Sequence, residues 1–484
     1  MPDWADALQA VRERRHAGTP LVGVTEDSRR LVPGMVFVAR RGEHVDGHAF
    51  LPEARAHGAV LTVGEHDADV VVPDSAAALA ALVSAWHGDP GNRLTLVGVT
   101  GTNGKSTVTH LVAAILRAAG TRTGLVGTTG YAFTGPLVHG PHTTPPPEVL
   151  YPLLRRWVDA GADSAVLEVS AQGLAQGRTA ALRFAASALT SFSPEHGEAF
   201  PDPAAYRAAK ARLFLQETAG VAVLPRAEAA SPEWADAVRG LRLLTFGRGG
   251  FVRATAQAAQ GFGPSLVDLR WNGIHVRFPF HLPGEHNLRN AACAAALALG
   301  LGVPADGIVS GLQSVRGVPG RGVILEEARG ATVVVDYAHN PAALRAVLSM
   351  ARAAATGRLH VVLGPRGERD PGKRPRMGAV IAALADSAVI TADRPASEDP
   401  TRAARSMLAA ARARGLDAVF VRDRAEAIAL AASRLGPGDA LVVTGKGIEP
   451  WGDDDSASGF RSDLEALGAV LDLPGGAEPA LAEA

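Results

Sequence analysis

Apolar and polar residues follow two different periods along this chain, and together they predict an α/β fold. Short apolar runs bounded by glycine, proline or aspartate are typical of buried strands, and apolar residues spaced three or four apart predict helices between them. The strand-like runs lie at 35–40, 59–64, 70–74, 94–100, 163–170, 186–193, 331–336, 359–365, 387–393, 417–423 and 440–447. Strands alternating with helices predict parallel sheets.

A second kind of pattern interrupts this order between residues 251 and 280. The stretches 251–257, 265–271 and 273–280 alternate apolar and polar residues more strictly, with short turns between them. Such alternation is typical of antiparallel strands with one face in water. We therefore expect an extra antiparallel sheet in this part of the chain.

Turn-rich breaks divide the chain into three expected domains. The first, residues 1–88, ends near "WHGDPGN", and the third begins after "VRGVPGR". The segment between them, residues 89–316, is expected to be a phosphate-loop-like parallel-sheet ATPase domain. Residues 317–484 repeat strand then helix, which predicts a Rossmann-like C-terminal domain.

Composition and charge narrow the classes of partner. The chain has 484 residues and a formal net charge of −1, so bulk attraction to nucleic acid or to an anionic membrane is not expected. No apolar run approaches the roughly 20 residues needed to span a bilayer, and residues 1–18 lack the apolar core of a signal peptide. The single cysteine, Cys293, excludes an internal disulfide. We expect a cytoplasmic monomer.

The stretch "GVTGTNGKSTVTHL", residues 98–111, predicts a phosphate-binding turn between a strand and a helix. The usual phosphate-loop pattern has glycine where this chain has Val99. Free N–H groups and the helix dipole still favour an anion here. Lys105 is expected to reach the β- and γ-phosphates of ATP, and the Ser106 hydroxyl to bind Mg²⁺. The candidate ATP-loop residues are Gly101, Thr102, Asn103, Gly104, Lys105, Ser106 and Thr107.

The string "TGTNGKST" resembles the ATP loop of the Mur ligase family, which also includes folylpolyglutamate synthases. Other stretches sharpen the resemblance to the MurE-type branch, which adds the third residue of the peptidoglycan stem peptide. They occur in order over nearly the whole chain: 27–50, "HTTPP" (142–146), "LEVSAQGLAQGR" (167–178), "AYRAAKARLF" (205–214), "GEHNLRNAACAAA" (284–296), "VDYAHNP" (335–341), "GERDPGKRP" (367–375) and "TGKGIEPW" (444–451).

The resemblance implies an ATP-dependent amide ligase that works through an acyl phosphate. Its substrates would be UDP-MurNAc-L-Ala-D-Glu and a diamino acid, and its cofactor Mg²⁺. By resemblance the catalytic residues are Lys105, Glu168, His196 and Lys210, and the metal ligands are Ser106, Glu168, His196 and Lys210, the last as a carbamate. Carbamylation requires a neutral amine, which burial favours.

Substrate-binding residues are also implied by the resemblance. Nucleotide positions are Asn287, Asn290, Arg321, Asp336, Tyr337, His339 and Asn340. UDP-substrate positions are Ser28, Thr143, Thr144, Ser170, Gln176 and Arg178, with Asp27, Arg29, His44, Asp46 and His48 near the uridine end. The chain departs from the family pattern at Ala171-Gln172, which often reads Ser-His, and in the loop after His196.

The third amino acid is predicted from "ADRPASEDP", residues 392–400. Diaminopimelate-adding relatives carry Asp-Asn-Pro-Arg here, and this chain has Ala396 where that arginine stands. Without the cation a distal carboxylate would be buried unpaired, so L-lysine or L-ornithine is expected. Arg394, a cation two residues earlier, is the alternative partner that would restore diaminopimelate. The candidate amino-acid-binding residues are Arg374, Asp393, Arg394, Gly445 and Glu449, with Glu398 as a further acidic partner.

Plainer interpretations stay open at this point. Glu168 would then be a solvated strand-end carboxylate, His196 a surface histidine, Lys210 a solvated helix residue, and 336–339 a helix N-cap. For the whole chain the alternatives are another ligase of the same fold, or a catalytically degenerate binding subunit, which the departures at 171–172, after His196 and at 396 favour. A nucleotide switch would not need the third domain.

Overall fold

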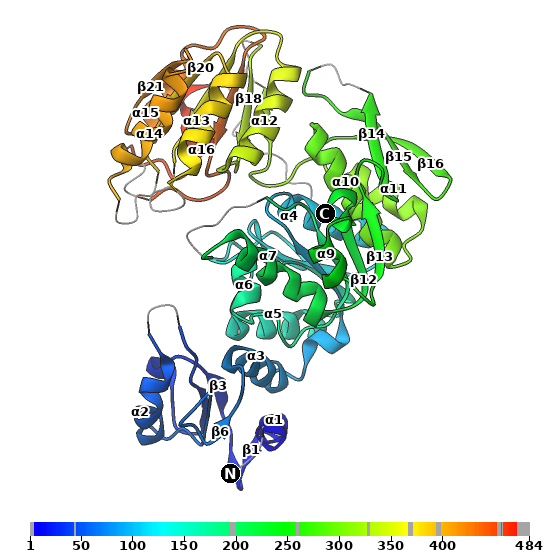
Figure 1. Cartoon of the computed structure of the whole chain (residues 1–484), viewed down its shortest axis with the longest axis vertical. Helices are drawn as coiled ribbons and strands as arrows, with labels where there is room; N and C mark the ends of the chain where they lie inside the picture. Colours follow the sequence, from blue (N-terminus) through cyan, green and yellow to red (C-terminus); the bar gives the residue numbers. More distant parts are fainter. Residues whose placement is uncertain are drawn as a thin grey trace.

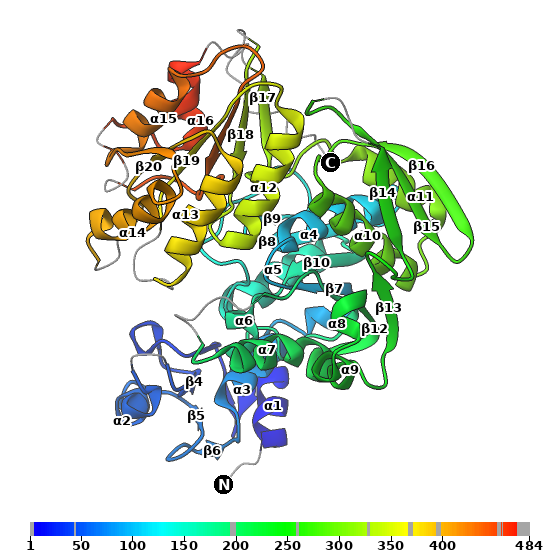
Figure 2. The same ribbon diagram turned by 45° about the horizontal axis from the view of Figure 1, so that its top comes forward.

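The chain folds into three α/β lobes arranged in sequence order, and the predicted fold class is confirmed (Figures 1 and 2). This computed structural model describes residues 4–42, 45–193, 200–257, 261–326, 330–365, 371–393, 398–452, 456 and 458–471. The predicted domain boundaries remain a prediction. Among the described residues, no helix is long and apolar enough to cross a bilayer.

The N-terminal lobe contains a four-stranded parallel sheet in the order β3-β4-β5-β6. Its strands are β3 (Gly23–Thr25), β4 (Met35–Val38), β5 (Leu61–Gly64) and β6 (Val70–Val71), beside a small hairpin of β1 (Arg15–His16) and β2 (Thr19–Pro20). Its helices are α1 (Trp4–Glu13), η1 (Ser28–Arg30), η2 (Gly47–Phe50), α2 (Leu51–Ala56) and α3 (Ser75–Trp86).

The central lobe is built on a seven-stranded sheet in the order β13-β12-β11-β7-β10-β8-β9, parallel except for β9 at one edge. Its strands are β7 (Thr95–Thr100), β8 (Thr123–Gly127), β9 (Gly130–Ala132), β10 (Ser164–Glu168), β11 (Phe184–Leu189), β12 (Thr218–Pro225) and β13 (Arg242–Phe246). Its helices are η3 (Pro90–Arg93), α4 (Lys105–Ala118), α5 (Pro147–Asp159), α6 (Ala171–Ala175), α7 (Pro203–Arg212), π-helical η4 (Leu213–Glu217), α8 (Arg226–Ala229), α9 (Pro232–Ala237), α10 (Glu285–Gly300) and α11 (Ala305–Ser314).

Successive residues of the central strands enter two different cores, which explains their continuous apolar runs. In β10, Ala165 and Leu167 pack on the side of α5, whereas Val166 packs on the side of α4, α10 and α11. A strand covered by helices on both faces has no solvent-facing position, so alternation disappears from its sequence.

The expected antiparallel sheet is present, in the order β14-β15-β16. Its strands are β14 (Arg253–Gln257), β15 (Ser265–Trp271) and β16 (Ile274–Phe280). Val267, Leu269 and Phe278 face the core shared with α10 and α11, and the opposite face carries Asp268 among arginine side chains. One buried and one wet face produce the alternation seen in the sequence.

The C-terminal lobe has a six-stranded sheet in the order β17-β18-β22-β19-β20-β21, parallel except for β17. Its strands are β17 (Val323–Glu326), β18 (Thr332–Asp336), β19 (Leu359–Leu363), β20 (Ser387–Ile390), β21 (Asp417–Phe420) and β22 (Ala440–Thr444). Helices α12 (Pro341–Ala354), α13 (Lys373–Leu384) and α14 (Pro400–Arg412) cover one face, and α15 (Arg424–Ala432) and α16 (Asp463–Val470) the other.

One buried ion pair ties the last helix of this lobe to its neighbour. Arg424 donates to both carboxylate oxygens of Asp463 at 2.6 and 2.8 Å, and both side chains are fully buried. The Trp451 indole also donates to Asp463 at 3.0 Å. The pair thus fixes α15, α16 and the segment after β22 together.

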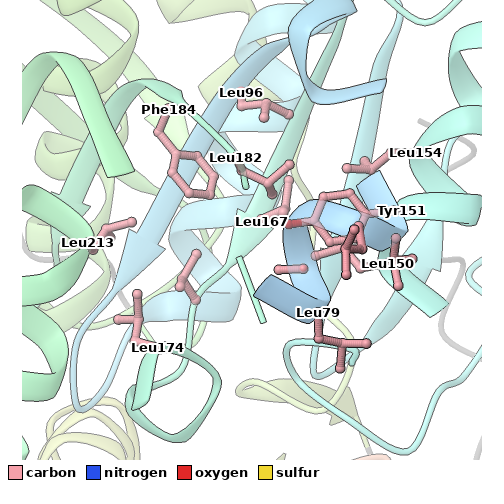
Figure 3. Packing of buried hydrophobic residues seen from close by; sticks show 14 of the residues in the cluster. Leu79, Leu96, Leu150, Tyr151, Leu154, Leu167, Leu174, Leu182, Phe184 and Leu213 are labelled. Atoms are coloured by element: carbon pink, nitrogen blue, oxygen red, sulfur yellow. The ribbon is translucent and has the colours of Figure 1, made fainter. Parts of the chain in front are cut away.

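The N-terminal and central lobes share one continuous hydrophobic core. Leu79 of α3 belongs to the same buried cluster as Leu150 and Tyr151 of α5 and Leu167 of β10 (Figure 3). The two faces of the C-terminal sheet instead have clusters of their own. The first two lobes are therefore joined by packing. Phe262, between β14 and β15, packs against one cluster of the third lobe, and the polar residues described next also link that lobe to the central one.

Candidate active site

The phosphate loop lies at the carboxyl end of β7, where only glycine fits two of its positions. Gly101 and Gly104 both have positive φ, +145° and +89°. A Cβ on Gly101 would lie 2.0 Å from the Thr190 hydroxyl, and one on Gly104 would lie 2.5 Å from Oδ1 of Asn290. The loop is therefore specified by close approach as well as by backbone conformation.

The segment after β11 holds this loop in place. The Thr102 N–H donates to the Ser191 carbonyl at 2.8 Å, and the Thr190 hydroxyl donates to the Asn103 carbonyl at 2.6 Å. The Ser191 hydroxyl accepts from the Asn103 N–H at 3.0 Å. These supporting residues were not singled out from the sequence, because a short Thr-Ser pair after a strand carries no distinctive signal.

Lys105 and Ser106 begin helix α4 directly after the loop. The Lys105 ammonium donates to the carbonyls of Gly101 and Thr102 at 3.0 and 3.1 Å. Arg321 reaches across from the segment before β17 and donates to the Ser106 hydroxyl at 2.9 Å. A cation from the C-terminal part of the chain thus meets the hydroxyl expected to serve the nucleotide.

Lys210 is buried, so the interpretation of a solvated helix residue is wrong. Its side chain is 1% exposed on α7, and Nζ donates to the Gly101 carbonyl at 2.9 Å. Nζ also lies 4.5 Å from the centre of the Tyr206 ring. A long basic side chain removed from water and directed at the phosphate loop is a candidate functional residue.

Glu168 is fully buried at the end of β10, which excludes a solvated strand-end carboxylate. Its Oε1 accepts from the Thr128 N–H at 2.9 Å and its Oε2 from the Thr128 hydroxyl at 3.2 Å. A Cβ on Gly127 would lie 2.2 Å from Oε1, so glycine there makes room for the carboxylate. Thr128 thereby fixes the orientation of an acidic side chain next to the phosphate loop.

The residues expected to meet the UDP-substrate form one network around Glu168. Thr144 donates its hydroxyl to the Glu168 carbonyl at 2.8 Å and to Ser170 at 3.2 Å. Arg178 donates to the Thr144 carbonyl at 2.5 Å and to the Gln176 side chain at 2.9 Å. The hydroxyls of Thr143 and Thr128 lie 2.9 Å apart. The structure therefore brings together six of the predicted residues from 143 to 178 and the phosphate loop's neighbour strand.

His110 lies one helical turn beyond Ser106 on α4, and it was not singled out as a site residue from the sequence. Its Nε2 is 2.9 Å from the Thr129 hydroxyl, in the turn that also carries Thr128. Burial lowers the pKa of His110 to about 4, so the imidazole is neutral at pH 7. Its spacing of four residues from Ser106 was the signal available in the sequence.

The nucleotide-side residues come from two lobes. Asn290 donates to Asn287 at 3.0 Å on α10, and Asn340 donates to the Asn103 side chain in the phosphate loop at 2.9 Å. Asp336 accepts from the N–H groups of Gly322 and Ala338, and burial raises its pKa. The cap of α12 is Asn340, so residues 336–339 are not a simple helix N-cap.

Acidic and basic residues of the amino-acid side are already paired with each other. Arg374 and Glu398 form a bidentate pair at 2.9 and 2.6 Å. Asp393 and Lys446 lie 2.8 Å apart, both fully buried. Gly445 has a φ of +108° and begins the turn that carries Glu449.

Four further residues named from the sequence cannot be placed. His196, Arg394 and Ala396 lie outside the described residues, as does His44. Lys446 was not singled out by sequence reasoning, although it stands inside the "TGKGIEPW" motif.

In the N-terminal lobe, predicted uridine-side residues support two 3-10 turns. Asp27 caps η1, in which Ser28 lies, and Asp46 caps η2. His48 is buried, with Nδ1 donating to Asp46 at 2.6 Å and Nε2 accepting from the Glu65 N–H at 2.8 Å. His66 brings a third potential ligand within 4.8 Å, but both nitrogens of His48 are already used, so the cluster is structural.

Two hollows mark the places where lobes meet. A cavity of about 250 Å³ runs along β3 to Trp86 and Glu148, between the N-terminal sheet and α5. A much smaller cavity, about 10 Å³, lies between the central and C-terminal lobes. It is lined by Thr128, Thr129, Pro319, Gly320, Arg321, Tyr337, Ile448 and Glu449.

Three family profiles match successive parts of the chain. They are the Mur ligase family catalytic domain at residues 20–87, the Mur ligase middle domain at 99–298, and the Mur ligase glutamate ligase domain at 320–447. A UDP-N-acetylmuramoyl-L-alanyl-D-glutamate–2,6-diaminopimelate ligase from Agrobacterium fabrum is 36% identical over 463 residues, which cover 92% of this chain and 94% of that protein. The chain belongs to the Mur ligase family.

Further relatives agree with a Mur ligase of MurE type. Diaminopimelate ligases of the same name from Alkalilimnicola ehrlichii and Bacillus licheniformis are 38% and 34% identical, and they align over 89% and 94% of this chain and 90% and 95% of their own. A solved structure with that name superimposes with a TM-score of 0.67 at 27% identity, covering 93% of this chain and 94% of the other. The predicted recognition is confirmed.

A Mur ligase is an ATP-dependent enzyme that forms amide bonds, so the predicted enzyme class is confirmed. Mur ligases use ATP and Mg²⁺, and this Mur ligase has residues that fit both. A Cβ on Gly101 or Gly104 would fill the space of the glycine loop. The Ser106 hydroxyl stands at the start of α4, directly after this loop, and the buried Glu168 carboxylate ends β10, the neighbour of β7. Both supply the oxygen donors that Mg²⁺ prefers. A MurF ligase from Thermotoga maritima in complex with ADP shares the fold, with a TM-score of 0.61 over 87% of this chain and 93% of its own at 21% identity.

The expectation of lysine or ornithine is not supported by these comparisons. Each of the curated relatives named above is a diaminopimelate ligase, and these names favour meso-diaminopimelate. The residues behind the expectation, 394–397, lie outside the described part of the Mur ligase.

Proposed function

We propose that this Mur ligase joins the amine of a diamino acid to the D-glutamate carboxylate of UDP-MurNAc-L-Ala-D-Glu. The similarity to ligases named for that substrate, 36% identity over 92% of the chain in one case, carries the proposal. The polar network from Thr143 to Arg178 supports it, because it ends at the buried Glu168 beside the phosphate loop. The reaction belongs to peptidoglycan biosynthesis.

The chemistry explains why two anions must meet at this edge of the sheet. A carboxylate is a poor electrophile, so the γ-phosphate of ATP is first transferred to it, and the amine then attacks the acyl phosphate. Lys105 and the loop N–H groups would hold the phosphates, and the Thr144–Arg178 network would orient the substrate carboxylate. Magnesium offsets the repulsion between the two anions. The residues proposed to hold it are Ser106, Glu168, His196 and Lys210 as a carbamate.

Each lobe has a separate role in this proposal. Residues 1–88 would bind the UDP end, residues 89–316 ATP, and residues 317–484 the amino acid. Ser28 of the first lobe lies near Glu26, whose N–H donates to Glu148 at 3.4 Å and so adjoins the start of α5. We also propose that the protein acts as a monomer in the cytoplasm, where ATP and UDP-linked precursors are supplied.

The amino acid is proposed to be meso-diaminopimelate. The names of the relatives favour it. L-Lysine or L-ornithine is a second candidate, which Ala396 favours because the arginine expected to pair with a distal carboxylate is missing. Arg394 is the cation that would serve diaminopimelate in its place.

Phosphate release from ATP tests both parts of the proposal. The assay contains UDP-MurNAc-L-Ala-D-Glu and, in turn, meso-diaminopimelate, L-lysine and L-ornithine. Release with diaminopimelate alone is expected. Release with lysine or ornithine would keep the ligase and reverse the choice of amino acid. No release with any of the three would reject the ligase and favour a catalytically degenerate relative.

A further inference from the structure

Tyr337 contacts the nucleotide side of the site with its ring. It follows Asp336 at the carboxyl end of β18, at the small cavity between the central and C-terminal lobes. The Arg321 guanidinium lies 4.2 Å from the ring centre, and Arg321 donates to the Ser106 hydroxyl at 2.9 Å. A cation over an aromatic face is attracted by the ring quadrupole. The ring therefore supports the arginine that reaches the phosphate loop.

The hydroxyl of the same side chain contacts the amino-acid side. The Tyr337 hydroxyl donates to the Glu449 carboxylate, in the turn after β22. The Glu449 backbone N–H donates to the Lys446 carbonyl at 2.9 Å, so this turn is held by its own hydrogen bond as well. A hydrogen bond to a charged carboxylate restrains its direction more strongly than a neutral one.

Close packing leaves Tyr337 little freedom to move. A Cβ on Gly447 would lie 3.3 Å from the Tyr337 Cβ, and one on Gly320 would lie 2.7 Å from the Ile448 nitrogen. The His339 ring meets the tyrosine ring edge-on at 4.8 Å. The turns at 320 and 447 are thus in close contact beside Tyr337. This packing restrains both the ring and the hydroxyl of the tyrosine.

We propose that Tyr337 is a positioning residue that aligns Arg321 with Glu449, and so couples the nucleotide half of the site to the amino-acid half. The inference rests on the proposed function, in which Glu449 meets the incoming amino acid. The two contacts use different parts of one side chain, so they can be removed separately. Tyr337→Phe keeps the ring and removes the hydroxyl, whereas Tyr337→Leu removes both.

The two variants are compared by KM for each substrate and by ADP affinity from calorimetry without amino acid. Tyr337→Phe is expected to raise KM for the amino acid by about 10- to 100-fold, the range for losing a hydrogen bond to a charged group. Its ADP affinity should stay within about twofold of wild type. Tyr337→Leu is expected to raise KM for the amino acid similarly and to weaken ADP by about threefold or more, because the cation–π contact is lost.

Tyr151→Phe is the matched control, since it removes another buried hydroxyl, which accepts from the Ala181 N–H at 3.2 Å in the core. It should change neither constant. An unchanged amino-acid KM in Tyr337→Phe, or an unchanged ADP affinity in Tyr337→Leu, would overturn the inference while the proposed function stands. A wild type inactive with every amino acid would instead reject the proposed function, and the amino-acid half of the inference with it.

Discussion

At the scale of single residues, the site contains ionisable side chains that are buried although burial costs them their hydration. Glu168 and Lys210 are at most 1% exposed, and both lie against the phosphate loop or its neighbouring strand. A buried charge requires a partner that compensates for lost hydration. Glu168 accepts hydrogen bonds from Thr128, and Lys210 donates to the Gly101 carbonyl. Carbamylation would replace the positive charge of Lys210 with a negative one.

Lys210→Ala is expected to abolish turnover, because the proposed carbamate would be lost. A short carboxylic acid such as acetate should restore part of the activity by filling the space left by the side chain. Phosphate release with and without the acid is the measurement. Arg207→Ala on the same helix is the control, and it should neither lose turnover nor gain any from the acid. Normal turnover of unrescued Lys210→Ala would contradict the carbamate.

Glu217, at the end of π-helical η4, makes stability depend on pH. Its carboxyl group accepts from Thr179 at 2.8 Å and is 3% exposed, and burial raises its pKa to about 7. The unfolded chain, with a carboxyl pKa near 4.3, loses this proton first, so stability should fall between about pH 4 and pH 7 and stay low above it.

Glu217→Gln should therefore gain stability over wild type at pH 8 but little at pH 4.5, by up to about 3 kcal/mol for a shift of this size. Melting temperatures across this range are the measurement. Glu233→Gln is the control, and its effect on stability should have the opposite sign at high pH. Hydrogen bonds from the Glu233 backbone N–H and the Ser231 hydroxyl lower the pKa of Glu233. A difference between Glu217→Gln and wild type that does not depend on pH would count against a raised pKa.

At the scale of elements, buried pairs hold segments that the apolar pattern does not position. The clearest is Arg424 with Asp463, which joins α15 to α16. Apolar runs predict that these helices exist, and burial of their apolar faces holds them on the sheet. The ion pair adds a fixed relation between them.

Arg424→Met is expected to destabilise the C-terminal lobe by about 3–5 kcal/mol, because Asp463 would be left as a buried charge. The double variant Arg424→Met/Asp463→Leu should recover part of this loss. Chemical denaturation measures both, with Arg239→Met as the control. Arg239 pairs with Asp236 at an exposed site, 81% and 67% exposed, where the loss should be about 0.5 kcal/mol or less. Equal losses at the two sites would contradict the argument.

Much of the element order was predictable because strands covered on both faces are continuous apolar runs. β15 coincides with the predicted stretch, and the phosphate loop was found from its glycines and its lysine between an apolar run and a helical pattern. The edge strands β3, β9, β13 and β17 were not foreseen, since an edge strand buries less and leaves a weaker pattern. The interior strands β8 and β12 were missed as well, and in both of them glycine interrupts the apolar run. The pairing of Arg374 with Glu398 was likewise hidden, because partners 24 residues apart are chosen by tertiary packing.

At the scale of the whole molecule, specific polar contacts beside the site link the C-terminal lobe to the central lobe. Asn340 at the start of α12 pairs with Asn103 in the phosphate loop, and Arg321 pairs with Ser106. Motions of the C-terminal lobe should therefore move the phosphate loop, because these side chains link the lobe and the loop directly.

Asn340→Ser is expected to separate the two roles of this asparagine. Serine can still cap α12, where Oδ1 accepts from the Ala343 N–H at 2.8 Å, but it is too short to reach Asn103. Amide hydrogen exchange should become faster in residues 102–106 and stay unchanged in α12. Asn340→Ala, which also loses the cap, should accelerate both. Unchanged exchange in the loop of Asn340→Ser would contradict the linkage.

The shared core of the first two lobes has a consequence for how such ligases diversify. Leu79 and Leu150 belong to one apolar cluster, so neither lobe can be replaced without repacking the other. The C-terminal sheet has clusters of its own, and the chain enters it through the turn at 316–321. A crossover at that turn would exchange the C-terminal sheet with both of its apolar clusters intact. Such a recombinant would have to keep the polar contacts that reach the phosphate loop, Arg321 with Ser106 and Asn340 with Asn103.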